Sequence, residues 1–206
     1  SHIAAMLAEQ GAQVRVLDNL TTGFRRNLEP LGEAVEFVEG DIVEAETCQY
    51  AVRGMDYVIH QAALASVPRS VAEPLASHAA NATGTLNLLE AARDAKVKRF
   101  VYAGSSSAYG NREIDYTHED LAPQPLSPYA SSKLAGEHYV RAFSECYGLD
   151  GVVLRYFNVF GPRQDPNSPY SAVIPIFVKA LLEGRPPSIH GDGEQSRDFT
   201  YVANNA

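Results

Sequence analysis

The chain has 206 residues and carries 25 acidic against 17 basic side chains, which gives a formal net charge of −8. This balance excludes a general nucleic-acid binder, and no apolar run approaches the ~18 residues of a membrane span. The two cysteines, Cys48 and Cys146, lie far apart and in no metal-ligand spacing, which excludes a disulfide scaffold and a structural zinc site, so we expect a cytoplasmic globular protein without a metal, membrane or nucleic-acid partner.

Short apolar strands alternate with helical patterns along most of the chain. Helical spacing before Gly11 is followed by predicted strands at residues 13–18, 35–39, 57–60, 99–103 and 151–155. Helical patterns separate these strands at residues 44–53, 72–94 and 129–147. Strands that alternate with helices in this way predict an α/β fold with a Rossmann-like, doubly wound parallel sheet.

The character of the sequence changes after Asn158, where prolines become frequent. We interpret residues 1–160 as the sheet domain and residues 161–206 as the beginning of a smaller, loop-rich substrate-binding region that ends in a strand at 198–202. Because the first residues already have helical spacing, we expect a piece of a longer protein. On this interpretation the first strand and its glycine-rich turn lie upstream of Ser1, and the second region is incomplete.

Acidic residues follow the first two predicted strands. Ligands of doubly wound sheets bind at the carboxyl ends of the strands, where an acidic side chain can accept hydrogen bonds from an adenosine ribose. Asp18 and Asn19 end the first strand, and Asp41 follows the second. A simple turn or a helix cap explains either position equally well, so neither residue is decisive alone.

Tyr129 and Lys133 provide the strongest chemical signal, because residues four apart share one face of a helix. An ammonium near a phenol favours the phenolate and lowers the tyrosine pKa, which would let Tyr129 act as an acid or base near neutral pH. This spacing also arises by chance. Three serines lie at the end of the preceding strand, at Ser105, Ser106 and Ser107, and a hydroxyl there can hydrogen-bond the same substrate oxygen. The hypothesis of an acid–base site depends on the combination of these serines with Tyr129 and Lys133.

Four motifs in this order resemble the extended short-chain dehydrogenase/reductase family of NAD-dependent epimerases and dehydratases. They are GSSSAYG at 104–110, SPYASSK at 127–133, LRYFNVFGP at 154–162 and GDGEQSRD at 191–198. Within the family the chain most resembles UDP-glucose and UDP-N-acetylglucosamine 4-epimerases. The runs HQAA at 60–63 and SVPRS at 66–70 are similar to the branch that acts on UDP-N-acetylglucosamine and its uronic acid.

The resemblance implies NAD as cofactor, a UDP-sugar as substrate and a homodimer of the full-length protein. It makes Tyr129 the catalytic base, with Lys133 and Ser105 as its catalytic partners. The implied cofactor-binding residues are Asp18, Asn19, Asp41, Ile42, Gln61, Ala62, Ala63, Asn81, Tyr129, Lys133 and Tyr156. The implied substrate-binding residues are Ser66, Arg69, Ser106, Ser107, Asn158, Val173 and Arg197.

Several of these residues also have a purely structural interpretation. Tyr156 can be a packing residue, Arg197 a surface ion pair and Asn81 a helix-surface residue, while His60 on its apolar strand is interpreted as a core histidine. The alternatives to an epimerase are a dehydratase or decarboxylase of the same family and a non-catalytic NAD-binding regulator. The dehydratase branch typically has Asp-Glu where this chain has Ser106 and Ser107, which favours the epimerase.

Overall fold

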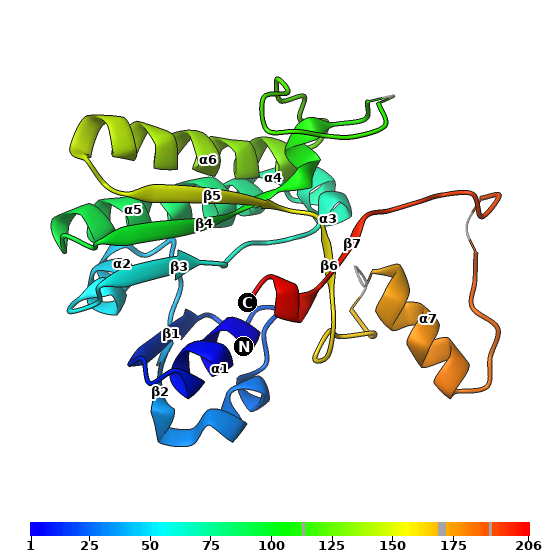
Figure 1. Cartoon of the computed structure of the whole chain (residues 1–206), viewed down its shortest axis with the longest axis horizontal. Coiled ribbons are helices and arrows are strands. Elements are labelled where there is room, and N and C mark those ends of the chain that lie inside the picture. Colours follow the sequence, from blue (N-terminus) through cyan, green and yellow to red (C-terminus); the bar gives the residue numbers. More distant parts are fainter. Residues whose placement is uncertain (113, 169–171, 190) are drawn as a thin grey trace.

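The computed structural model describes residues 1–112, 114–168, 172–189 and 191–206. Among these residues the strands form three separate parallel groups (Figure 1). One is the pair β1 (Val14–Asp18) and β2 (Val35–Glu39). The second has β4 (Arg99–Ser105) between β3 (Tyr57–His60) and β5 (Gly151–Tyr156). The third is the pair β6 (Asn158–Phe160) and β7 (Phe199–Tyr201).

Helices connect these strands and cover the three-stranded sheet. The α-helices are α1 (His2–Glu9), α2 (Ala45–Val52), α3 (Val67–Ala72), α4 (Pro74–His78), α5 (Gly84–Asp94), α6 (Pro128–Tyr147) and α7 (Val173–Leu182). A π-turn, η3 (Ala79–Thr83), joins α4 to α5, and the short 3₁₀ turns are η1 (Arg25–Asn27), η2 (Glu29–Ala34), η4 (Ser106–Tyr109) and η5 (Val202–Asn204).

The hydrophobic core lies where α6 packs on β4 and β5 and where α5 packs against both α6 and α2 (Figure 1). Leu89 of α5, Phe100 and Tyr102 of β4 and Val140 of α6 are at most 1 % exposed. Burial of apolar surface on this scale is the main favourable contribution to folding. The middle of the chain therefore forms a rigid support for the residues at the carboxyl ends of β3, β4 and β5.

The structure confirms the predicted α/β class with parallel strands. The strands predicted at 35–39 and 57–60 have the expected bounds, whereas β4 and β5 run further, to Ser105 and Tyr156. The five strands do not form one hydrogen-bonded sheet, because β1 pairs with β2 and β3 pairs with β4. Among the described residues no backbone ladder joins these two groups.

The helix predicted at 72–94 begins later and contains an irregular turn. Glu73 has φ −130°, and the helical backbone begins at Pro74, as expected because the residue before a proline avoids helical geometry. The π-turn then interrupts the regular hydrogen-bonding pattern and contains the buried Asn81. Such turns often occur at functional sites. Helix α3 was not predicted.

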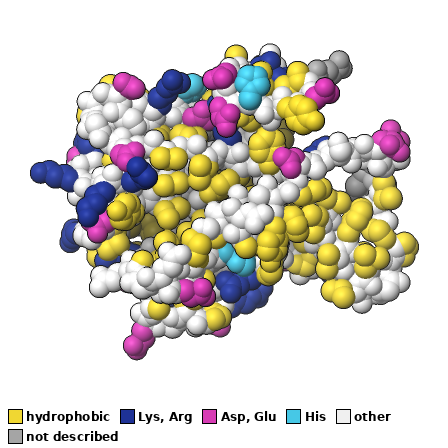
Figure 2. All heavy atoms as spheres, in the orientation of Figure 1, with side chains coloured by type: hydrophobic (Ala, Val, Ile, Leu, Met, Phe, Trp, Pro, Cys, Tyr) yellow, Lys and Arg dark blue, Asp and Glu magenta, His cyan; other side chains and the backbone are white. Residues whose placement is uncertain are grey.

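The proline-rich region also contains one helix that was not predicted. Helix α7 forms at Val173–Leu182 despite Pro175, because a proline is tolerated in the first turn of a helix. Apolar side chains of α7 remain on the surface, where Val178, Leu181 and Leu182 are 50, 65 and 84 % exposed. Figure 2 shows hydrophobic side chains gathered over this part of the molecule.

The two cysteines are in contrasting environments. Cys48 is buried in α2 and its thiol donates to the Ile42 carbonyl at 3.2 Å, whereas Cys146 is exposed near the end of α6. Burial raises the pKa of Cys48 to about 11. Within the described part of the chain, no helix is long and apolar enough to cross a membrane.

Candidate active site

The first turn of α6 positions Tyr129. Ser127 caps the helix by accepting a hydrogen bond from the Ala130 amide at 3.1 Å, and Pro128 occupies the first helical position. Lys133 follows one turn later and is only 3 % exposed. The motif at 127–133 thus provides both the start of the helix and the placement of its two candidate catalytic side chains.

Ser105 lies at the carboxyl end of the central strand β4, opposite Tyr156 at the end of β5. Its Oγ accepts hydrogen bonds from the Ser107 amide at 3.2 Å and from the Ser107 hydroxyl at 2.8 Å. Its side chain also interacts with Tyr129 in a way that favours the phenolate. The structure therefore brings together the serine and tyrosine that were predicted to share a substrate oxygen.

The pKa of Tyr129 moves opposite to the sequence-based expectation. Burial raises the pKa, and the interaction with Ser105 lowers it by less, so the net direction is upward. The phenolate loses the solvation of water, which burial penalises. Burial, and not a neighbouring charge, is the largest cause of the shift.

Lys133 points into the core. Its Nζ lies 4.3 Å from the centre of the Tyr102 ring, and the Tyr102 hydroxyl donates to the Lys133 carbonyl at 3.1 Å. Burial lowers the pKa of Lys133 to about 8. The lysine thus titrates much closer to neutrality than a lysine in water.

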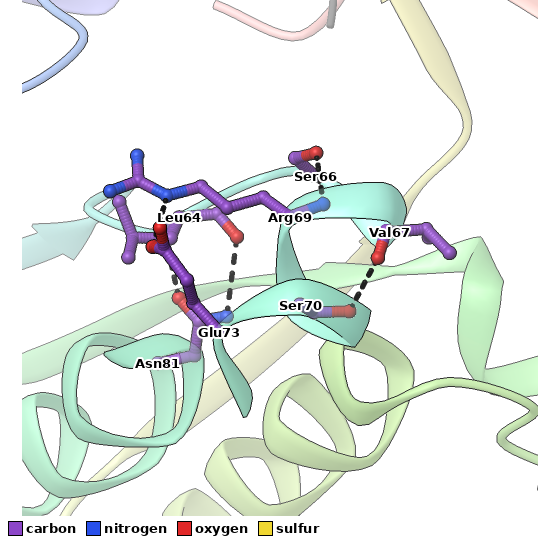
Figure 3. Close-up of polar contacts among 7 residues, drawn as sticks. All are labelled: Leu64, Ser66, Val67, Arg69, Ser70, Glu73 and Asn81. Carbon is purple, nitrogen blue, oxygen red and sulfur yellow. Dashed lines mark hydrogen bonds and ion pairs between the residues drawn. The ribbon is translucent and has the colours of Figure 1, made fainter. Parts of the chain in front are cut away.

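Buried hydrogen bonds connect α6 with the π-turn and the loop after β3. Asn81 is fully buried, accepts from the Leu64 amide at 2.8 Å and donates to Ser132 Oγ at 3.0 Å (Figure 3 shows its contact with Leu64). Ser132 in turn donates to the Tyr129 carbonyl at 2.9 Å. These contacts fix the backbone that carries Tyr129, and the helix-surface interpretation of Asn81 is wrong.

A second polar cluster lies at the carboxyl ends of β1 and β2. Asn19 Nδ2 donates to Asp41 Oδ2 at 2.8 Å, and Asp41 Oδ1 accepts from the Val43 amide at 2.9 Å. Asp18 Oδ1 accepts from the Leu20 amide at 2.7 Å. The structure thus brings the predicted cofactor-binding residues Asp18, Asn19 and Asp41 together at one edge, and their oxygens suit the hydroxyl donors of a ribose.

The similarity to known proteins covers the whole chain. Residues 1–206 match the NAD dependent epimerase/dehydratase family. A putative UDP-glucose 4-epimerase of Methanocaldococcus jannaschii is 40 % identical over 204 residues, which cover 98 % of this chain and 66 % of that protein. The chain belongs to the NAD dependent epimerase/dehydratase family.

Solved structures of relatives agree with this family assignment. The UDP-N-acetylglucosamine 4-epimerase of Methanobrevibacter ruminantium is 46 % identical with a TM-score of 0.93, covering 98 % of this chain and 64 % of that one. A dTDP-glucose 4,6-dehydratase of Streptomyces venezuelae is 34 % identical with a TM-score of 0.89, covering 99 % and 65 %. This member of the epimerase/dehydratase family therefore spans about two thirds of the length of such relatives.

Membership of the epimerase/dehydratase family confirms the predicted Rossmann-like fold and, at the level of the family, NAD as the cofactor. Other predicted cofactor residues also follow strand ends. Gln61, Ala62 and Ala63 come directly after β3, and Tyr156 ends β5. Ile42 is only 7 % exposed and belongs to the hydrophobic core.

The predicted substrate residues of this family member are more dispersed. Ser106 and Ser107 adjoin Ser105 in η4. Ser66 caps α3 by accepting from the Arg69 amide at 3.1 Å, and Arg69 pairs with Glu73 at 3.2 Å (Figure 3). Asn158 donates to the Asp198 carbonyl at 2.9 Å. Val173 is 40 % exposed at the start of α7, and Arg197 is exposed and donates to the Ser196 carbonyl at 2.7 Å.

Tyr102 belongs to the site but was not predicted as one of its residues. Residues 100 and 102 point to the same face of a strand, so the alternation in RFVYA could have predicted two inward aromatic rings on β4. Nothing in that alternation indicates that one ring meets Lys133. His60 has the expected core position, with its Nε2 2.8 Å from the Thr85 hydroxyl.

Proposed function

We propose that this chain is the catalytic part of an NAD-dependent nucleotide-sugar 4-epimerase that inverts C4 of a UDP-sugar. The observation that carries the proposal is the meeting of Ser105 with Tyr129 at the strand ends, one helical turn from the buried Lys133. Relatives named UDP-glucose and UDP-N-acetylglucosamine 4-epimerase support it. Residues 1–160 would bind NAD, and residues 161–206 would begin the nucleotide-sugar region.

NAD is expected at the carboxyl edge of the strands. Asp18 and Asn19 would bind the adenosine ribose, Asp41 and Ile42 would flank the adenine, and Gln61 to Ala63 would line the cofactor. Lys133 would bind the nicotinamide ribose, with Tyr156 and Asn81 nearby. When bound, NAD supplies the acceptor and donor of the hydride exchanged at C4 of the sugar.

The protein's own residues would then hold the sugar and move its proton. Tyr129 would take the proton of the 4-hydroxyl as the 4-keto sugar forms, and would return a proton after the sugar has turned over. Ser105 would hydrogen-bond the same oxygen and hold it in reach of the phenol. Ser66, Arg69, Ser106, Ser107, Asn158, Val173 and Arg197 would contact the sugar or its nucleotide.

Ser106 and Ser107 favour epimerisation over dehydration. Removal of water across C5 and C6 needs groups that deliver and accept protons at those carbons, and serine hydroxyls do this poorly at neutral pH. Both serines lie directly beside Ser105 in η4. A 4,6-dehydratase, a decarboxylase and a non-catalytic NAD-binding regulator are the other outcomes of the test.

The test uses the protein at its full natural length, incubated with UDP-N-acetylglucosamine, UDP-glucose or their uronates without added NAD. We expect the C4 epimer to appear with no net reduction of cofactor. Tyr129→Phe should lower the rate by roughly 10²–10⁴ because the acid and base is lost. Tyr139→Phe is the matched control, since Tyr139 lies on the same helix but is 38 % exposed. Turnover that survives Tyr129→Phe would contradict the proposal.

We further infer that the full-length protein is a cytoplasmic homodimer formed through the helices that contain Asn81 and Tyr129. Apolar side chains on these helices and their neighbours support this: Val71 and Leu75 on α3 and α4 are 66 and 85 % exposed. Helices α3 and α4 both pack beside α6. Light scattering of the full-length protein should give twice the monomer mass, and Leu75→Glu should shift it toward the monomer.

A further inference from the structure

The buried ammonium of Lys133 meets an aromatic ring where a carboxylate would be the usual partner. Its Nζ lies 4.3 Å from the centre of the Tyr102 ring, within the range of a cation–π interaction. Within the described ranges, no carboxylate lies at ion-pair distance from Lys133. A charge in this position needs compensation, because burial alone strongly disfavours the charged form.

The Tyr102 ring is held firmly in place. Its side chain is 0 % exposed, and its hydroxyl donates to the carbonyl of Lys133 itself at 3.1 Å. Gly136, one turn after Lys133, makes room for this contact, because a Cβ there would lie 2.3 Å from the Tyr102 oxygen. The His60 ring packs on the same tyrosine with centres 5.4 Å apart. The ring and the helix backbone are thus locked to each other.

We propose that Tyr102 is a positioning residue, whose ring face holds the charged Lys133 ammonium in its buried place one turn after Tyr129. The proposal rests on the catalytic roles proposed above for Tyr129 and Lys133. In this proposal Tyr102 has two separate functions. The hydroxyl fixes the helix backbone at Lys133, and the ring face stabilises the charge.

The other groups around Tyr102 do not replace its ring in stabilising the Lys133 charge. His60 of β3 is neutral, since burial lowers its pKa to about 3, so it adds no competing positive charge. Burial and the charges of Tyr129 and Glu137, both on α6, raise the pKa of Tyr102, so its phenol remains a protonated donor. Thr85, from α5, contributes a hydroxyl that does not titrate.

The decisive experiment changes the electrostatics of the ring and preserves its shape. Position 102 of the full-length protein is replaced by phenylalanine and by a phenylalanine with three ring fluorines, which removes most of the negative charge from the ring face. The Lys133 pKa is read by NMR of ¹³C-labelled lysine, with Lys133→Arg to assign the signal. The same fluorinated residue at Phe100, on the same face of β4, is the matched control.

We expect Tyr102→Phe to leave the Lys133 pKa near its starting value, because the ring face remains. The fluorinated ring at position 102 should lower it by roughly one unit, a tenfold shift toward the neutral amine. The fluorinated ring at position 100 should leave it unchanged. Equal Lys133 pKa values for the plain and fluorinated rings at position 102 would overturn the proposal.

A second measurement connects the ring to turnover. In the pH profile of the epimerisation rate, the fluorinated ring at position 102 should move the alkaline limb to lower pH by the same amount as the Lys133 pKa. If the fluorinated ring lowered the rate equally at all pH values and left the alkaline limb in place, the role of Tyr102 would be merely structural and the proposal would be overturned. Absence of turnover in the unmodified protein would contradict the proposed function, while the NMR titration would still test the ring contact.

Discussion

The sheet β3–β4–β5 with α5 and α6 differs sharply from the segment that carries β6, α7 and β7. In the first, Leu89, Phe100 and Tyr102 are fully buried, and the predicted catalytic residues lie at its edge. In the second, α7 leaves Leu181 and Leu182 largely exposed, and Val173 and Arg197 lie on the surface. The predicted catalytic residues thus lie against the buried core, whereas Val173 and Arg197, two of the predicted substrate-binding residues, lie on an exposed segment.

Removal of a buried leucine from the rigid part should have the largest effect on stability. Leu89→Ala deletes a fully buried side chain of α5, so we expect the free energy of unfolding to fall by about 2–5 kcal/mol. Urea denaturation followed by circular dichroism measures the change. A loss below 1 kcal/mol would mean that the two parts of the molecule do not differ as described.

Lys133→Met should stabilise the rigid part while it removes activity. Because burial lowers the Lys133 pKa to about 8, the charged form costs stability at neutral pH, and the variant should gain about 1–3 kcal/mol at pH 7. The unfolded lysine binds more protons than the folded one between about 8 and its ordinary pKa. The wild type should therefore gain stability relative to Lys133→Met as the pH rises from 8 toward 10.5.

Paired urea titrations at pH 7 and 10 test this expectation. The advantage of Lys133→Met should be full at pH 7 and should shrink at pH 10. An advantage that is equal at both values would show that the variant acts through packing and not through the buried charge.

His60 should make the rigid part sensitive to acid. Burial lowers its pKa to about 3, so below the ordinary value the unfolded chain binds a proton that the folded chain does not. Stability should fall by about 1.4 kcal/mol per pH unit between about 6.5 and 3 from this residue alone. His60→Gln should remove this part of the slope in unfolding curves measured at pH 7, 6, 5 and 4.

The smallest effect is expected in the exposed segment. Leu182→Ala shortens a side chain that is 84 % exposed, so the free energy of unfolding of this chain should change by at most about 0.5 kcal/mol. The same urea titration that is used for Leu89→Ala measures it. A loss comparable with that of Leu89→Ala would place α7 in the cooperative core and remove the contrast.

Local sequence patterns predicted those elements whose local preferences agree with their place in the fold. The strands of the rigid part are short and apolar, and Tyr129 and Lys133 follow a proline and a capping serine that start α6 at a defined residue. The spacing therefore predicted which helix face carries both side chains. The proximity of Ser105 to Tyr129 was predicted because ligands of such sheets bind at the carboxyl ends of the strands.

Long-range contacts explain what the sequence did not reveal. No local pattern shows that Lys133 lies on the Tyr102 ring, or that burial outweighs other effects on the Tyr129 pKa, because both depend on how α6 packs on β4. Helix α7 was not predicted because the frequent prolines of this region were interpreted as the mark of a loop-rich segment, whereas Pro175 lies in the first turn of the helix, where proline is tolerated. The π-turn with Asn81 was missed because its sequence, AANAT, fits a regular helix.

The contrast between the two cysteines makes the chain suitable for selective labelling. Cys48 is buried with a raised pKa, so little of it is thiolate, the reactive form, at neutral pH. Cys146 is exposed one residue before the end of α6. A maleimide dye should therefore attach at this single position, at the opposite end of α6 from Tyr129. Its fluorescence anisotropy would report on the order of that helix without any engineered substitution.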